Sequence, residues 1–340
     1  ERRQSVAIIG AGPGGLAAAE ELRRKGYQVA IYDRYDRVGG LLVYGIPNFK
    51  LEKEIVRRRA DLIAEAGAAF HLECEVGKDV SLEELRAHHD AVLIATGVYQ
   101  DRDIKVPGVG LERIYPAMEF LTASNRKGLG DAVPAFDDGR LDADGKDVVV
   151  VGGGDTAMDC VRTAVRQGAK SVSCLYRRDR DNMPGSLREV SHAEEEGVEF
   201  VWLSAPEAFL GNGAVNAVRA LRVHLGVPDA TGRQTPQLIE GSHFTLPADM
   251  VIKALGFDPE DLPVLFDAPE LKVTRWGTVG IDFRTMMTSI EGVFAAGDIV
   301  RGASLVVWAV RDGRDAAEQI DGYLQRKETA DEDAPAVAAA

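Results

Sequence analysis

The chain has 340 residues, which is enough for about two domains. Hydrophobic residues make up 45% of it and charged residues 28%, a balance that excludes a wholly disordered chain. The 54 acidic residues outnumber the 40 basic ones, giving a formal net charge of −14. Such a chain is not expected to bind nucleic acid, because phosphate backbones recruit basic surfaces.

Apolar runs and cysteines narrow the class of protein further. The longest charge-free apolar runs are far shorter than the ~20 residues that span a bilayer, and no signal peptide is visible. Cys74, Cys160 and Cys174 show no CxxC spacing, which argues against a disulfide framework, a redox disulfide or a four-cysteine iron–sulfur site within this chain. The six histidines show no zinc spacing. We therefore expect a cytoplasmic protein with no metal ligands and no membrane partner.

The chain reads as two α/β units in succession. The first has strands at 5–10, 28–32 and 91–95, with helices at 13–25 and 51–66. After one expected helix at 116–125, the pattern restarts with a strand at 147–151, a helix at 156–167 and a strand at 171–176. Residues 198–203 and 217–225 read as strands of a smaller sheet, 303–317 as a helix and 325–340 as a disordered tail. Two mononucleotide-binding units predict two nucleotide sites.

The first site begins with Gly10-Ala11-Gly12-Pro13-Gly14-Gly15, which matches G-x-G-x-x-G between an apolar strand and a helix. Gly10 allows the tight turn, Gly12 lets the backbone approach a pyrophosphate, and Gly15 lets the helix pack on the strand. The helix N-terminus then offers free N–H groups to the phosphates. Asp33 ends the second strand, where an acid accepts both ribose hydroxyls.

Two further features favour FAD over NAD at this site. Gly39-Gly40 follows Asp33, where a flavin enzyme needs bare backbone along the pyrophosphate and ribityl chain. Near the C-terminus, Gly297-Asp298 ends a short strand, and Asp298 is expected to hydrogen-bond a ribityl hydroxyl. The helix that follows places the N–H groups of Leu305, Val306 and Val307 where they could face the flavin N1/O2 edge. A helix N-terminus stabilises the negative charge that builds up there on reduction.

The second glycine loop differs from the first in the nucleotide that it favours. Gly152, Gly154 and Ala157 give G-x-G-x-x-A, and the alanine form is frequent in NADP sites. The next strand ends in Arg177-Arg178 and not in an acid. Arginines bind a 2′-phosphate that an acid would repel, so we expect NADPH. Glu189, at the start of the next helical stretch, is either a contact of this nucleotide or an ordinary surface residue.

Small residues end two more strands where a nucleotide domain meets its neighbour. Ile94-Ala95-Thr96-Gly97 closes the first sheet, and Ile252-Lys253-Ala254-Leu255-Gly256 precedes the return of the chain. Their matched placement indicates hinge and cofactor contacts, with Thr96 and Gly97 on the FAD side and Gly256 on the NADPH side.

Taken together, these motifs resemble the FAD/NAD(P)H two-dinucleotide-domain oxidoreductases. Within them, Gly39–Pro47 with Lys50-Leu51, Gly152–Asp159, Tyr176–Arg180 with Met183–Ser186, and Gly302–Ala309 look like the small (beta) subunit of bacterial NADPH-dependent glutamate synthase. The resemblance covers about residues 5–325. Dihydropyrimidine dehydrogenase, in its N-terminal part, and adrenodoxin reductase share the same core.

This resemblance implies an α/β fold of two Rossmann-like domains, adrenodoxin reductase- or glutathione reductase-like, with the NADPH domain (104–281) inserted between two parts of the FAD domain (1–103 and 282–324). It carries FAD contacts over to Gly14, Asp33, Leu41, Val76, Asp298 and Leu305–Val307. It carries NADPH contacts over to Gly154, Asp155, Thr156, Arg177, Arg178 and Glu189. It places 4Fe-4S clusters only in an upstream domain that is absent from this sequence.

The expected activity is that of an NADPH-oxidising flavoprotein. Hydride passes from the nicotinamide to FAD, the protein positions the two cofactors, and no catalytic acid or base is required. The resemblance implies that electrons then reach a large (alpha) subunit that makes glutamate from glutamine and 2-oxoglutarate. Alternatives are a stand-alone NADPH:ferredoxin-type reductase like adrenodoxin reductase, an FAD monooxygenase or a scaffold subunit. The missing CxxC pair argues against a disulfide reductase.

Overall fold

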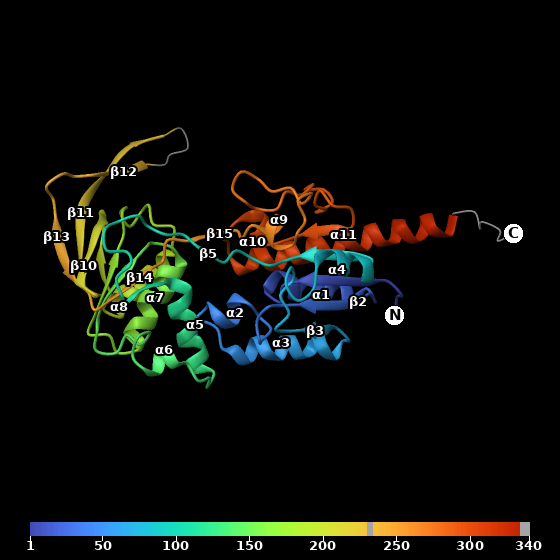
Figure 1. Cartoon of the computed structure of the whole chain (residues 1–340), viewed down its shortest axis with the longest axis horizontal. Coiled ribbons are helices and arrows are strands. Elements are labelled where there is room, and N and C mark those ends of the chain that lie inside the picture. Colours follow the sequence, from blue (N-terminus) through green and yellow to red (C-terminus); the bar gives the residue numbers. More distant parts are fainter. Residues whose placement is uncertain (230–233, 334–340) are drawn as a thin grey trace. The chain divides into compact units, whose positions relative to one another are not determined.

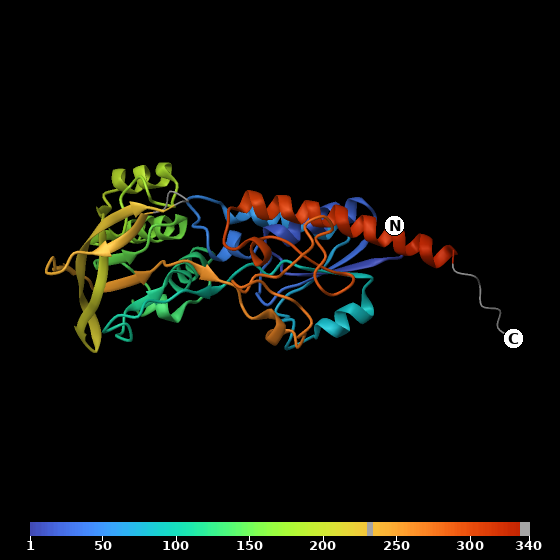
Figure 2. The same cartoon turned by 90° about the horizontal axis from the view of Figure 1, so that it is seen from above.

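The structure is a computed structural model that describes residues 1–229 and 234–333 (Figures 1 and 2). The chain forms two units. The first contains residues 1–43, 51–100 and those from 257 onward, and the second contains residues 44–50 and 101–256. Each unit is built on a five-stranded parallel sheet. The expected α/β fold, with a second dinucleotide-type domain inserted into the first, is thereby confirmed.

The sheet of the first unit has the strand order β16-β4-β1-β2-β3. Its strands are β1 (Ser5–Ile9), β2 (Gln28–Tyr32), β3 (Ala69–His71), β4 (Ala91–Ile94) and β16 (Val293–Ala295). Its helices are α1 (Pro13–Arg24), α3 (Lys53–Glu65), α4 (Leu82–His88), α9 (Leu262–Leu265), α10 (Asp298–Arg301) and α11 (Val306–Asp333). The short helix α2 (Leu41–Tyr44) ends where the chain first leaves this unit.

Strand β1 shows why the sheet is covered on both sides. Val6 and Ile8 pack into a core with α1 and α11, whereas Ala7 and Ile9 pack into a second core with α4 and α9. All four side chains are buried. A continuous apolar run is therefore required, because alternate residues of a strand point to opposite faces.

The second unit has three layers. Its parallel sheet has the order β6-β14-β7-β8-β9, formed by β6 (Ile114–Pro116), β7 (Asp147–Val151), β8 (Ser171–Leu175), β9 (Glu199–Val201) and β14 (Met250–Lys253). Helices α5 (Ala117–Gly128), α7 (Asp155–Arg166) and α8 (Leu187–Glu195) share a core with one face, and α6 (Pro134–Asp137) lies beside α5. An antiparallel sheet shares a core with the other face, formed by β10 (Ser204–Asn212), β11 (Ala214–Pro228), β12 (Gln234–Leu238) and β13 (Phe244–Pro247).

The structure corrects three expectations. Strand β9 extends the main parallel sheet beside β8, so only the segment expected at 217–225 belongs to the smaller sheet. Residues 257–281, expected in the NADPH domain, belong to the first unit, and the strand β15 (Phe257–Asp258) pairs with β5 (Gln100–Asp101) where the chain returns. Residues 325–333, expected to be disordered, continue helix α11, whereas 334–340 lie outside the described residues.

Candidate dinucleotide-binding sites

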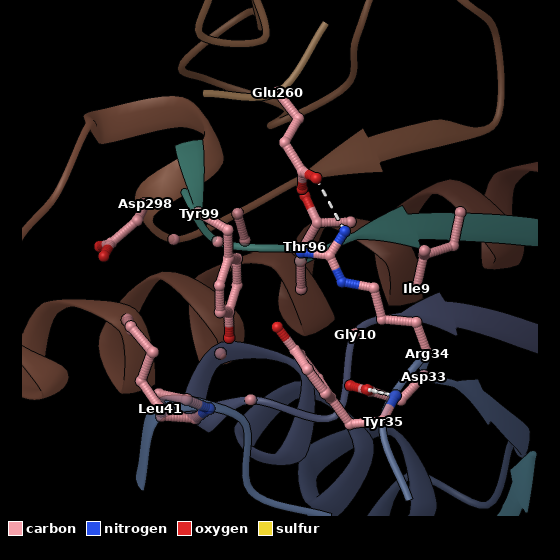
Figure 3. A pocket seen from close by; sticks show the side chains of 18 of the residues that line it. Ile9, Gly10, Asp33, Arg34, Tyr35, Leu41, Thr96, Tyr99, Glu260 and Asp298 are labelled. Carbon is pink, nitrogen blue, oxygen red and sulfur yellow. Dashed lines mark hydrogen bonds and ion pairs between the residues drawn. The ribbon is translucent and has the colours of Figure 1, made fainter. Parts of the chain in front are cut away.

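In the first unit, the carboxyl ends of β1, β2, β4 and β16 meet at a cleft, which Figure 3 shows from close by. The space inside the cleft, together with the solvent at its open mouth, amounts to about 1080 Å³. The residues expected to bind a dinucleotide that line it are Gly10, Gly12, Gly14, Asp33, Leu41, Val76, Thr96, Gly97, Gly297, Asp298, Leu305 and Val306. Three others, Gly15, Gly40 and Val307, lie outside the lining. A ligand position at the carboxyl ends of parallel strands is the rule for open α/β sheets.

The glycines of the first loop have different structural tasks. Gly10 has φ +111°, and a Cβ atom there would lie 2.4 Å from the Ala95 carbonyl oxygen. A Cβ atom on Gly15 would lie 2.0 Å from the Gly10 carbonyl oxygen, so this glycine lets α1 pack against the strand. A Cβ atom on Gly12 would meet nothing within 4 Å. Gly12 therefore leaves space for a ligand, while Gly10 and Gly15 allow the close backbone contacts that the fold requires.

Asp33 is held rigidly at the end of β2. Its carboxylate accepts a hydrogen bond from the Ala11 N–H at 2.6 Å and another from the Tyr35 N–H at 2.8 Å. Burial raises the pKa of Asp33, and the two N–H bonds oppose that rise. These bonds link the glycine loop to the acid at the strand end, in the cleft where a ribose is expected.

Sequence reasoning missed a group of side chains that share this cleft. The Arg34 guanidinium pairs with the Glu260 carboxylate at 2.7 Å and lies 5.0 Å from the Tyr99 ring centroid and 5.4 Å from that of Tyr35 (Figure 3). Burial raises the pKa of Tyr99, so its hydroxyl stays neutral. Arg34 could have been suspected because it follows Asp33 directly. Glu260 could not, because only the fold brings these distant segments together.

Two polar atoms in the cleft lack partners. Among the described residues, the buried Thr96 Oγ1 and Asp298 Oδ1 have no hydrogen-bond partner. Burial raises the pKa of Asp298 to about 6, against an accepted hydrogen bond from the Ser304 N–H. Buried polar groups are normally satisfied, so both atoms indicate a polar ligand.

Helix α11 starts beside this cleft. Its first hydrogen bonds are donated by Trp308 and Ala309 to the Leu305 carbonyl. The N–H groups of Val306 and Val307 precede this bonding and form the positive end of the helix. Leu305 and Val306 line the cleft, so the helix N-terminus is available to an anionic group there.

The loop after β7 repeats the first loop closely. Gly152 has φ +150°, and a Cβ atom there would lie 2.2 Å from the Ala254 carbonyl oxygen. A Cβ atom on Gly153 would lie 2.3 Å from the Tyr176 ring, whereas one on Gly154 would meet nothing within 4 Å. Gly154 is thus the counterpart of Gly12, with open space in front of its backbone.

Further predicted residues surround this second loop. Asp155 and Thr156 open helix α7, Ala157 is buried, and the Asp155 carboxylate accepts the Ser186 N–H at 2.9 Å. Gly256 is the last residue of the unit and accepts the Arg102 N–H through its carbonyl at 3.0 Å. These contacts fix the shape of the loop and of the end of β14.

Two arginines follow β8. Arg177 is exposed, and Arg178 is half-buried with an Nε atom that has no partner among the described residues. By contrast, Arg180 pairs with Glu194 at 2.7 Å. The Arg178 guanidinium is therefore free to bind an anion.

Glu189 lies in an ion network. Its carboxylate lies 2.6 Å from Lys50 Nζ and 2.7 Å from Arg162 Nη1. It is not an ordinary surface side chain, because this network is half-buried. Its predicted contact with a nucleotide stays a prediction.

The cysteines are free thiols, and burial raises the pKa of Cys174 to about 12. Over the ranges 1–229 and 234–333, no group of three or more His, Cys, Asp or Glu side chains is placed to hold a metal ion. None of the helices in the same ranges is long and apolar enough to cross a membrane.

Comparison with known proteins gives a consistent result. A family model described as pyridine nucleotide-disulphide oxidoreductase matches residues 4–313. The glutamate synthase [NADPH] small chain of Azospirillum brasilense is 70% identical over 323 residues, which cover 95% of this chain and 67% of the relative. The putative glutamate synthase [NADPH] small chain of Cereibacter sphaeroides is 65% identical over 324 residues, covering 95% and 78%.

Solved structures confirm the fold. The structure of Mycobacterium tuberculosis FprA in complex with NADPH aligns with a TM-score of 0.80 at 20% identity, covering 97% of this chain and 87% of that one. The sequence matches are far closer, and they cover nearly the whole chain. The chain therefore belongs to the pyridine nucleotide-disulphide oxidoreductase family and, within it, to the glutamate synthase [NADPH] small chains.

Proposed function

We propose that this chain oxidises NADPH bound at the second loop and passes the electrons through FAD bound in the first cleft. Their destination is an iron–sulfur and flavin partner, the large subunit of glutamate synthase, which makes glutamate from glutamine and 2-oxoglutarate. The observation that carries the proposal is the pair of glycine loops. One faces a cleft that contains Asp298, and the other lies in the unit that carries Arg178; among the described residues, Asp298 Oδ1 and Arg178 Nε have no hydrogen-bond partner. The names of the relatives agree with NADPH as the reductant.

The residues of the first cleft fit FAD. Thr96 Oγ1 and Asp298 Oδ1 need partners, and ribityl hydroxyls are groups that can both donate and accept. The N-terminus of α1 behind Gly12 suits a pyrophosphate, and Asp33 suits the adenosine ribose. The N-terminus of α11 suits the edge of the flavin ring that becomes negative on reduction. When bound, FAD supplies the chemistry of accepting a hydride and releasing electrons singly.

The residues of the chain itself bind, orient and stabilise charge. Arg301 pairs with Asp312 at 2.6 Å and so fixes α10 against α11, whose N-terminus lines the cleft. Asp33 is fixed by its two backbone bonds. No proton has to be moved by a side chain in hydride transfer between two cofactors. The protein contributes by holding both nucleotides in one geometry, which removes orientational entropy from the barrier.

Two glycine substitutions test the proposal, because their effects are expected to be complementary. Gly12→Val is expected to abolish FAD binding, since the new side chain starts from a Cβ position with nothing within 4 Å and enters the space open to the ligand. Gly154→Val is expected to retain FAD and its yellow colour while losing NADPH binding, since it fills the corresponding space in the second unit.

Gly110→Val is the matched control, because a Cβ atom there also meets nothing within 4 Å. The measurements are the flavin content of the purified protein and NADPH binding by calorimetry. Stoichiometric flavin in the Gly12→Val protein would show that the first cleft is not the FAD site. Loss of flavin in all three variants would show that the effect is one of folding.

A further inference from the structure

One short segment belongs to the second unit although both of its neighbours in sequence belong to the first. The chain leaves the first unit after Val43, contributes residues 44–50 to the second unit, and returns at Leu51. We call residues 44–50 the strap. Its base is closed within the first unit, because Lys53 Nζ donates a hydrogen bond to the Leu42 carbonyl at 2.9 Å. The strap is thus a loop whose ends are held together, and its contacts lie within the second unit, to which it belongs.

Tyr44 and Asn48 of the strap contact helix α5. Asn125 Nδ2 donates a hydrogen bond to the Tyr44 carbonyl at 3.0 Å, and Asn125 is buried. Asn48 lies against Gly128, where a Cβ atom would come within 2.7 Å of its Nδ2 atom. A larger residue at position 128 would therefore require the Asn48 side chain to move.

The last part of the strap contacts helices α7 and α8. The Phe49 ring centroid lies 3.8 Å from the Arg166 guanidinium and 4.8 Å from that of Arg162, both on α7. Lys50 Nζ lies 2.5 Å from Asp159 Oδ1 on α7 and 2.6 Å from Glu189 Oε2 on α8. Lys50 therefore joins two helices that come from separate parts of the sequence.

The ion network around Lys50 is balanced in charge and half-buried, with Asp159 and Arg162 as its buried members. Three cations (Lys50, Arg162 and Arg166) meet three carboxylates (Asp159, Glu189 and Glu196). Burial raises the pKa of Asp159 to about 6, and the Lys50 ammonium opposes that rise. Removing the lysine alone would leave one carboxylate charge in the network uncompensated. Such a loss destabilises a protein more than removing both partners of a buried ion pair.

The helices that hold Lys50 also hold the second glycine loop. Helix α7 begins at Asp155, directly after Gly154. The turn before α8 is bonded to the same loop, since the Gly185 N–H donates to the Gly153 carbonyl at 2.9 Å and the Ser186 N–H donates to Asp155. Within the second unit, the strap is therefore bonded to the helices that carry the second glycine loop.

We propose that Lys50 is a positioning residue for hydride transfer, acting through helices α7 and α8. Its two ion pairs join these helices within the second unit, and they thereby fix the glycine loop and the turn that the helices carry. A bound NADPH that is misplaced by about 1 Å can lower a rate about 100-fold. The inference rests on the proposed function, because it concerns transfer between the two nucleotides.

Lys50→Met is the test, measured on the FAD-loaded full chain by stopped-flow reduction with NADPH. We expect the rate of flavin reduction at saturating NADPH to fall roughly 10- to 100-fold, with flavin content and the Kd for NADPH unchanged within about twofold. Lys50→Arg should restore most of the rate, since it keeps the charge. Hydrogen–deuterium exchange gives a second readout: amides of residues 44–50 should exchange faster in Lys50→Met than in wild type.

The matched control is Lys170→Met, which removes an exposed lysine paired with Asp147 at 2.8 Å in the same unit. It should change neither the rate nor the exchange. The double variant Lys50→Met with Asp159→Asn removes a charge of each sign, so it should recover stability but not the rate. It also keeps the test possible if Lys50→Met alone folds poorly.

Several outcomes would overturn the inference. An unchanged reduction rate in Lys50→Met would show that Lys50 does not position NADPH, and a weakened Kd with an unchanged rate would make Lys50 a binding residue. A double variant with wild-type rate would assign a purely structural role to the network. The proposed function fails separately, if the wild-type chain binds no FAD or if NADPH does not reduce it.

Discussion

The coenzyme preference can be predicted from one unpaired guanidinium. Arg178 follows the end of β8, and its buried Nε atom has no partner among the described residues. A charge-assisted hydrogen bond to a 2′-phosphate contributes about 1.5–3 kcal/mol. Replacing Arg178 by Met, which keeps most of the apolar stem, should therefore lower the preference for NADPH over NADH by about 10- to 150-fold.

The assay is kcat/KM for NADPH and for NADH, measured by ferricyanide reduction. Most of the decrease should appear in kcat/KM for NADPH. The kcat/KM for NADH should change little, because NADH has no 2′-phosphate. Arg180→Met is the matched control, because Arg180 is a near neighbour whose guanidinium already pairs with Glu194 at 2.7 Å. A preference that is unchanged in Arg178→Met, or one that falls as far in Arg180→Met, would refute the assignment of this arginine to the phosphate.

Three further predictions follow from the first unit. Asp298→Asn should make the flavin-free protein more stable by about 3 kcal/mol at pH 7–8 in denaturant unfolding. Burial raises the carboxyl pKa from 3.8 to about 6, so the free energy of unfolding of the wild type falls as pH rises between these values. The difference between the two proteins should therefore vanish below pH 4. An equal difference at pH 4 and pH 8 would contradict this. Gly15→Ala should destabilise by more than about 2 kcal/mol despite the helix propensity of alanine, because its Cβ would lie 2.0 Å from the Gly10 carbonyl oxygen. A Tm equal to that of Gly110→Ala would argue against this contact. Finally, NADPH should bleach the flavin of this chain and support ferricyanide reduction. It should not support glutamate synthesis, even when the large subunit is added without an iron–sulfur domain. Robust glutamate synthesis in that mixture would point to direct flavin-to-flavin transfer.

Local patterns predicted most of the fold and the nucleotide loops, because each loop is a contiguous strand, turn and helix. The first strand, its glycines and the Asp33 at the end of the second strand could be read together within one short stretch of sequence. Asp298 could be placed because the Gly-Asp ending of a strand is also a local signal. These features depend on continuous apolar runs in strands buried on both faces and on turns that only glycine can make.

Contacts between distant segments could not be predicted in this way. Glu260 reaches Arg34, and Lys50 reaches Glu189, only after the sheets have formed. Glu189 shows the difference well, since its position at the start of a helix could be seen in the sequence whereas its ion pairs with Lys50 and Arg162 could not. The end of α11 also escaped prediction, because the highly charged composition of residues 325–333 is compatible with both helix and disorder.

The strap has a consequence for dissecting this protein into parts. A fragment cut at residues 100–101 and 256–257 would carry the second parallel sheet and all of its helices, yet it would lack residues 44–50. Its α7 and α8 would then present Asp159 and Glu189 without the Lys50 ammonium, and Asn125 would lose the carbonyl that it binds. Neither unit can therefore be isolated as a continuous stretch of chain with its packing intact. An excised version of the second unit would need residues 44–50 supplied as a peptide or grafted through a new loop.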